Sequence, residues 1–166
     1  IDPRKNTALL IEAFGRLPQN NLRLVITGLD PNAQAHFAAL AVQHGLRLGQ
    51  QIQLLGFVSE RDLAALYTAA EMLLYPSRYE GFGLPALEAM QCGTPVITAN
   101  TTSLPEIAEG AALLINPNDA AALCAAIQQL HNDTSLQQRL RTAGLARAAQ
   151  FNWQSSAKLM LTLLSK

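Results

Sequence analysis

The chain has 166 residues with 12 basic and 12 acidic side chains, so its formal net charge is zero, and 49% of its residues are hydrophobic. This length suits a single domain with a sizeable core. The balanced charge gives no basic surface for nucleic acid or an anionic membrane, so a phosphate has to be recognised locally, by loops and helix ends. Because the sequence shows no signal peptide and no long apolar run, we expect a cytoplasmic protein that does not span a membrane.

The two cysteines and three histidines form no metal-binding pattern. Cys92 and Cys124 lie in apolar helical segments and are expected to be small, reduced core residues. His36, His44 and His131 lack the spacing of metal ligands. We therefore expect no metal site.

Short apolar runs alternate with helical patterns along the chain. The runs that predict buried strands cover residues 22–27, 52–58, 72–75, 95–99 and 112–115. Helical patterns have apolar faces around residues 10–17, 33–41 and 63–70, and further helices are predicted at 84–92, 120–131, 135–150 and 153–164. This alternation predicts an α/β domain with a Rossmann-like, doubly wound parallel sheet, in which ligands bind beyond the carboxyl ends of the strands.

Several side chains have structural explanations. Two segments match the capping box, in which a serine and an acid three residues later close the first turn of a helix. The pairs are Ser59 with Asp62 and Ser103 with Glu106. Near the end of the chain, Phe151 and Trp153 are expected to seat the last helix on the core.

The most informative segment is residues 80–88, Glu-Gly-Phe-Gly-Leu-Pro-Ala-Leu-Glu. It follows a predicted strand and a polar turn, and Pro85 favours the first turn of a helix that stops at Gly93. A strand, a glycine-bearing turn and a helix N-terminus in this order present free backbone N–H groups and a partial positive charge. This combination suits a phosphate.

Two glutamates make this segment more specific. Glu88 is the only charged residue between Leu84 and Cys92, and a lone carboxylate on an apolar helix needs a hydrogen-bonding partner. Glu88 could cap a neighbouring loop or helix, or it could bind a ligand. Glu80 precedes the helix, where a carboxylate can simply complement the helix dipole.

The wording EGFGLPALEAMQCGTPVI resembles the E-x7-E signature of the retaining glycosyltransferases of family 4, the group 1 glycosyl transferase type, which have the GT-B fold. The flanking segments LLGFVSERDLAALYTAAEMLLYPS and ITANTTSLPEIAEGAALLINPND are similar to that family too. The resemblance covers almost the whole chain, but only the C-terminal half of such an enzyme. It implies that residues 1–166 form the Rossmann-like domain that binds the nucleotide-sugar donor.

The resemblance assigns roles to individual residues. Lys5 matches the lysine that contacts the diphosphate, and a solvated lysine at a helix entry is an equal alternative. Glu80 matches the carboxylate that meets the donor sugar and is essential for transfer, so it is the expected catalytic residue. Glu88 matches the residue that accepts hydrogen bonds from the ribose hydroxyls. The loop approaching the phosphates and sugar is matched by Gly81, Phe82, Gly83 and Leu84, and the strand end that meets the nucleobase by Gly56, Phe57 and Val58.

The implied activity is that of a hexosyltransferase. Family resemblance implies transfer, with retention, from a nucleotide-diphospho-sugar such as GDP-mannose or a UDP-sugar to a glycan or lipid-linked acceptor, with no cofactor or metal. Mannose is favoured by the segment NTTSLPEIAEGAALLINP, which looks most like bacterial mannosyltransferases of surface polysaccharide. The acceptor would bind through an N-terminal domain outside this chain, and the full-length enzyme could associate peripherally with the inner face of the cell membrane.

Three other classes remain open. A non-catalytic nucleotide-sugar-binding or assembly module fits a chain with half a cleft. A dinucleotide-dependent oxidoreductase needs G-x-G-x-x-G, but Ala86 stands where the third glycine belongs. GT-B epimerases and phosphorylases share the architecture without the E-x7-E wording.

The start of the chain predicts a gap in the sheet. Doubly wound sheets open with a central strand, and Ile1-Asp2 leads straight into a helix. The resemblance places that strand, and an arginine that shares the task of Lys5, before Ile1, so the isolated domain should be weakly active or inactive. Because unpaired strand edges are unfavourable, we expect residues outside this sequence, a shifted strand or another chain to fill the slot.

Overall fold

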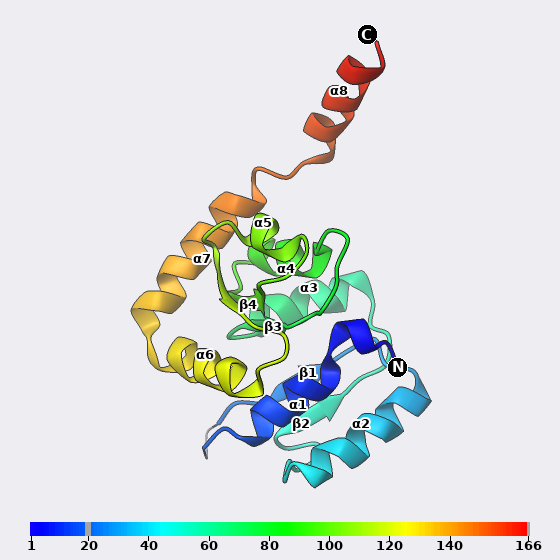
Figure 1. Cartoon of the computed structure of the whole chain (residues 1–166), viewed down its shortest axis with the longest axis vertical. Helices are drawn as coiled ribbons and strands as arrows, with labels where there is room; N and C mark the ends of the chain where they lie inside the picture. The colour runs from blue at the N-terminus through cyan, green and yellow to red at the C-terminus, as the bar shows by residue number, and fades with distance from the viewer. Residues whose placement is uncertain (19–20, 166) are drawn as a thin grey trace.

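The computed structural model describes residues 1–18 and 21–165 (Figure 1). The strands in this part of the chain are β1 (Leu24–Ile26), β2 (Ile52–Leu54), β3 (Leu73–Tyr75), β4 (Val96–Ala99) and β5 (Ala112–Ile115). The helices are η1 (Pro3–Lys5), α1 (Thr7–Gly15), α2 (Pro31–Gln43), α3 (Glu60–Ala69), α4 (Leu84–Gln91), α5 (Leu104–Ala108), α6 (Ala120–Asn132), α7 (Thr134–Ala148) and α8 (Trp153–Leu164). The alternation of short strands and helices is therefore confirmed.

The strands form two parallel sheets. β1 pairs with β2, and β4 lies between β3 and β5 with Val96 opposite both Leu73 and Ala112. All four residues of β4 are buried, because this strand has a neighbour on each edge and helices on its faces. The predicted α/β class with parallel strands is confirmed.

The sheet differs from a single doubly wound sheet at its centre. No strand of the described residues lies between β1 and β3, so the two sheets are separate. A shifted strand from within this part of the chain was one expected occupant of that slot, and this expectation is wrong. The other two expected occupants, residues outside this sequence and another chain, stay predictions.

Side chains cap four of the described α-helices. The carboxylates of Asp30, Asp119 and Asp133 accept hydrogen bonds from backbone N–H groups in the first turns of α2, α6 and α7, at 2.8–2.9 Å. The predicted cap at Ser59 forms as well, since its hydroxyl accepts the N–H of Asp62 at 3.1 Å. Such caps satisfy N–H groups that have no partner inside the helix.

The second predicted capping box is wrong. Ser103 precedes α5 but makes no side-chain cap bond. Its hydroxyl donates to the backbone carbonyls of Glu80 and Phe82, at 3.1 and 2.9 Å. Glu106 therefore does not act as the acidic partner of a box, and its backbone carbonyl accepts a hydrogen bond from Arg147 instead.

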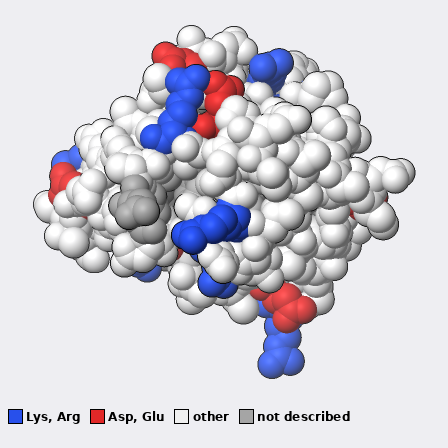
Figure 2. Space-filling model, turned by 90° about the horizontal axis from the view of Figure 1, so that it is seen from below, with Lys and Arg blue, Asp and Glu red and all other residues white. Residues whose placement is uncertain are grey.

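Two apolar clusters hold the domain together. The larger one joins α1, α2 and α6 to the strands and includes the fully buried side chains of Ile11, Ile52, Ile97, Leu123 and Leu130. The smaller one lies around α4 and includes Met90 and Val96. On the face in Figure 2, acidic and basic side chains are scattered among neutral ones.

The last helix does not pack as expected. α8 projects away from the rest of the domain (Figure 1), and Trp153 is 85% exposed, so the prediction that Trp153 seats this helix on the core is wrong. Phe151 does make contacts, with its ring edge-on to Phe82 and 4.7 Å from the guanidinium of Arg147.

None of the described helices combines the length and the apolar character that crossing a bilayer requires.

Candidate functional site

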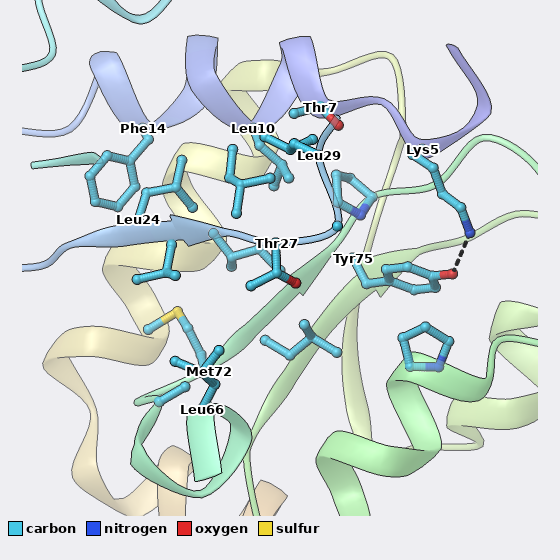
Figure 3. A pocket seen from close by; sticks show the side chains of 18 of the residues that line it. Lys5, Thr7, Leu10, Phe14, Leu24, Thr27, Leu29, Leu66, Met72 and Tyr75 are labelled. Carbon is cyan, nitrogen blue, oxygen red and sulfur yellow. Dashed lines mark hydrogen bonds between the residues drawn. The ribbon is translucent and has the colours of Figure 1, made fainter. Parts of the chain in front are cut away.

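A lysine, a tyrosine and a glutamate meet beyond the carboxyl end of β3. The ammonium of Lys5, from η1, lies 2.8 Å from Oε1 of Glu80. It also donates to the hydroxyl of Tyr75 at 3.2 Å, the bond that is dashed in Figure 3. The Tyr75 hydroxyl donates to the same Glu80 oxygen at 2.5 Å. Two residues that the sequence predicted for one site, 75 positions apart, are thus in direct contact.

The environment of Glu80 keeps its carboxylate ionised. Partial burial by itself raises the pKa of Glu80, but hydrogen bonds from Lys5 and Tyr75 outweigh burial and hold this pKa below its usual value. Burial and the bond to Glu80 raise the pKa of Tyr75, so this phenol stays protonated and acts as a donor. At neutral pH Glu80 therefore carries a negative charge beside the Lys5 ammonium.

Glu88 lies in the second turn of α4, facing the same pocket. Its carboxylate is half-buried and accepts a hydrogen bond of 3.3 Å from the Tyr67 hydroxyl of α3. Burial and the nearby charge of Glu88 raise the pKa of Tyr67. Among the described residues the partner of Glu88 is thus a side chain rather than a backbone N–H, and Glu88 does not cap a neighbouring element.

Hydrogen bonds to its backbone hold the loop between Glu80 and α4 in place. Ser103 binds the carbonyls of Glu80 and Phe82, as described above, and the Thr102 hydroxyl accepts the Glu80 N–H at 3.2 Å. Gly83 precedes α4 with a left-handed φ of +104° and offers no side-chain cap. The N-terminus of α4 therefore keeps its dipole uncompensated by a side chain, in contrast to α2, α3, α6 and α7.

The apolar members of this loop are exposed. Phe82 and Leu84 are 45% and 50% exposed, and they flank the buried Gly83. Gly81 lies between Glu80 and Phe82 with open space around its α-carbon. Solvent or a ligand can therefore reach the loop along most of its length.

The third predicted segment, Gly56 to Val58, follows β2. The carbonyl of Gly56 accepts the N–H of Gly28 at 3.0 Å, and Gly28 lines the pocket that Lys5 and Glu88 also line. The side chain of Phe57 is 87% exposed. These residues therefore adjoin the pocket through Gly28, whereas Lys5 contacts Glu80 directly and lines the same pocket as Glu88.

Four residues of this site were not predicted. Tyr67 and Tyr75 hold the two glutamates, and Thr102 and Ser103 hold the loop between them. A tyrosine that ends an apolar strand needs a partner for its hydroxyl, and this was a usable signal for Tyr75. Ser103 and Thr102 act across more than 20 positions of sequence, and no local pattern reveals such contacts.

Known proteins share both sequence and fold with this chain. The family model described as "Glycosyl transferases group 1" matches residues 1–147. The O-antigen chain mannosyltransferase B of Escherichia coli is 43% identical over 158 residues, which cover 93% of this chain and 41% of that protein. Sucrose-phosphate synthase (tll1590) from Thermosynechococcus elongatus matches with a TM-score of 0.85 and 36% identity, over 99% of this chain and 42% of that one.

A solved fragment shows which part of such proteins the chain resembles. The C-terminal domain of the glycosyl transferase group 1 family protein LpcC from Francisella tularensis matches with a TM-score of 0.77 and 26% identity, over 90% of this chain and 80% of that one. Against longer proteins the chain spans less than half of their length. The family match and the shared parallel α/β fold place the chain among the group 1 glycosyl transferases, with the fold of the C-terminal domain of a GT-B enzyme.

Proposed function

We propose that this domain holds the donor of a retaining glycosyltransferase, which moves a hexose from a nucleotide-diphospho-sugar to a glycan or lipid-linked acceptor. The observation that carries the proposal is the meeting of Lys5 and Glu80 in front of the uncapped N-terminus of α4, with Glu88 on the same helix. In this proposal a ligand would meet one positive group, one helix dipole and two carboxylates.

The diphosphate is the group that this positive charge fits. Lys5 is 47% exposed at its side chain, so its ammonium can reach a ligand, and the α4 dipole adds a partial positive charge beside it. Both would stabilise the negative charge that develops on the leaving diphosphate when the bond to the sugar breaks. Charge neutralisation of this kind requires no metal or cofactor in our proposal.

The two carboxylates fit hydroxyl groups on either side of the diphosphate. Glu88 is half-buried and, within residues 1–18 and 21–165, its carboxylate accepts one side-chain hydrogen bond, of 3.3 Å from Tyr67, so it can also accept hydrogen bonds from ribose hydroxyls. Glu80 is held by Tyr75 and would accept hydrogen bonds from the sugar. Donor binding would share Lys5 between Glu80 and the diphosphate, while the Tyr75 bond keeps the carboxylate in place.

Mannose is the sugar that we propose, with GDP-mannose as the first donor to test and a UDP-sugar as the second. The support is the 43% identity with the O-antigen chain mannosyltransferase B of Escherichia coli. The acceptor would reach the sugar from an N-terminal domain, since the relatives are more than twice as long as the match.

Calorimetric titration with GDP, UDP and ADP tests donor binding. Glu88→Gln should weaken the preferred nucleotide by roughly 1–3 kcal/mol, because a neutral amide replaces charge-assisted hydrogen bonds to the ribose. Glu60→Gln, at an exposed position of α3, is the matched control and should leave the affinity unchanged. Equal affinities for Glu88→Gln and the unchanged chain would remove Glu88 from the site.

Turnover is tested in a longer polypeptide that includes the N-terminal domain. There Glu80→Ala should mainly lower kcat, since its contacts to the sugar are expected to strengthen in the transition state. A wild-type rate for Glu80→Ala would remove it from the catalytic residues. Nucleotide binding without any transfer by the longer polypeptide would instead identify a non-catalytic binding module.

A further inference from the structure

The turn that follows β4 contains a strained residue. Thr102 has a φ of +53°, in the left-handed region that β-branched side chains rarely adopt. The other non-glycine residues with a positive φ, within residues 1–18 and 21–165, are Asn6 and Glu109. Asparagine tolerates this conformation because its short side chain can bind the local backbone, whereas threonine is branched and stiff at its β-carbon. Thr102 therefore holds a conformation that its own side chain opposes.

A tight turn requires this conformation. The N–H of Leu104 donates to the carbonyl of Thr101 at 3.2 Å, which closes a four-residue turn over residues 101–104. Thr102 occupies the second position of this turn, and Ser103, with φ −80° and ψ −14°, occupies the third. Turns with a positive φ at the second position are dominated by glycine, asparagine and aspartate. Glycine would thus form this turn with less strain than threonine.

Burial does not explain why a threonine occupies this position. The side chain of Thr102 is exposed and belongs to neither apolar cluster. In the part of the chain that the structure describes, its hydroxyl makes one hydrogen bond, accepting the N–H of Glu80 at 3.2 Å. Glycine has no side chain and could not make this bond. The unfavourable backbone and the bond to Glu80 therefore belong to the same residue.

The next residue of the turn directs its hydroxyl at the same loop. Ser103 donates to the carbonyls of Glu80 and Phe82, at 3.1 and 2.9 Å. The turn thus binds both the N–H and the carbonyl of Glu80, while Lys5 and Tyr75 bind its carboxylate. The main chain and the side chain of Glu80 are therefore held by different elements of the fold.

We infer that Thr102 is a positioning residue, whose strained backbone places its hydroxyl where it fixes the main chain of Glu80 and so directs the carboxylate toward the donor sugar. This inference rests on the proposed function, because it takes Glu80 as the catalytic carboxylate. Strained conformations persist where the surrounding structure enforces them, and they cluster at functional sites. A displacement of about 1 Å at a reacting centre can slow a reaction by about a hundredfold. The threonine therefore favours turnover, although it lowers stability.

Three substitutions at Thr102 separate the hydroxyl from the strain. Thr102→Ser keeps the hydroxyl, Thr102→Val keeps the branched shape without it, and Thr102→Gly removes both. Exchange of the Glu80 amide, followed by NMR in this chain without any donor, should be about tenfold faster in Thr102→Val and Thr102→Gly than in Thr102→Ser. Thr142→Val removes a hydroxyl that is bonded within α7, and as the control it should leave this exchange unchanged. Equal exchange in all three Thr102 variants would overturn the inference.

Stability and turnover should separate in Thr102→Gly. Its Tm should equal or exceed that of the original chain, because glycine adopts a positive φ without strain. In the longer polypeptide that includes the N-terminal domain, kcat should nevertheless fall about tenfold in Thr102→Gly and Thr102→Val, with the KM for the donor changed less than about twofold. Thr102→Ser should retain most of the rate. An unchanged kcat in Thr102→Gly would overturn the inference, and so would a lower kcat accompanied by a lower Tm, which is the result of a merely structural role.

Glu80→Ala distinguishes failure of this inference from failure of the proposed function. If Glu80→Ala lowers kcat in the longer polypeptide and the Thr102 variants do not, the inference alone is wrong. If Glu80→Ala keeps the wild-type rate, the proposed role of Glu80 is wrong, and the inference that rests on it is wrong as well.

Discussion

Gly83 is the position where a single methyl group should disturb the site most. Its φ of +104° lies in the left-handed region, and a β-carbon built there would lie 2.8 Å from Cδ2 of Leu104. Leu104 is fully buried at the start of α5, so it cannot move into solvent. The left-handed backbone costs a non-glycine residue about 1–2 kcal/mol, and overpacking adds about 1–2 kcal/mol.

We therefore expect Gly83→Ala to lower the free energy of unfolding by about 2–4 kcal/mol. In a chain of this size that corresponds to a fall in Tm of about 4–16 °C, measured by far-ultraviolet circular dichroism. Gly81→Ala is the matched control two residues earlier in the same loop, where an added β-carbon meets no atom within 4 Å.

Two results would refute this reasoning. The first is an equal fall in Tm for Gly83→Ala and Gly81→Ala. The second concerns the contact with Leu104. If the clash contributes, combining Gly83→Ala with Leu104→Ala should destabilise by less than the sum of the single changes. Strict additivity would show that the backbone conformation alone causes the loss.

The remaining predictions concern Glu80. Tyr75→Phe should raise the pKa of Glu80, measured from its carboxyl NMR shifts, and should lower the free energy of unfolding by about 1–2 kcal/mol, because a hydrogen bond to a charged group is lost. Tyr79→Phe, at an exposed tyrosine, is the control. An unchanged Glu80 pKa in Tyr75→Phe would contradict the assigned hydrogen bond. Because the folded pKa of Glu80 lies below its ordinary 4.5, the carboxylate stabilises the fold above that pH, and this contribution is lost as the pH falls through the folded pKa. Glu80→Gln should therefore make the unfolding free energy fall less steeply below pH 4.5 in urea titrations, and an identical pH slope in both proteins would count against a lowered pKa.

Local hydrophobic patterns in the sequence predicted several helices and strands with their boundaries. The predicted strand 112–115 and helix 153–164 coincide with β5 and α8. The runs 22–27 and 52–58 give the shorter strands β1 and β2, because their ends turn out of the sheet into loops, as at Gly28 and Gly56. Hydrophobicity marks a buried segment but does not show how far its backbone stays paired.

The errors arise where a contact is distant in sequence. Ser103 has the spacing of a capping box, yet its hydroxyl binds carbonyls more than 20 positions away. Trp153 has the periodicity of a core residue, yet it lies on a helix that projects from the domain. For the site, E-x7-E spacing predicted Glu80 and Glu88 but not the tyrosines that hold them. A carboxylate can be recognised in a sequence more readily than its partner.

The position of Lys5 depends on hydrogen bonds made by its two neighbours in the chain. The buried side chain of Asn6 donates to the carbonyls of Pro76 and Pro117, at 3.0 and 2.6 Å. The N–H of Arg78 donates to the carbonyl of Arg4 at 2.8 Å. These bonds fasten both flanks of Lys5 to the segments that follow β3 and β5, and so hold its ammonium beside Glu80.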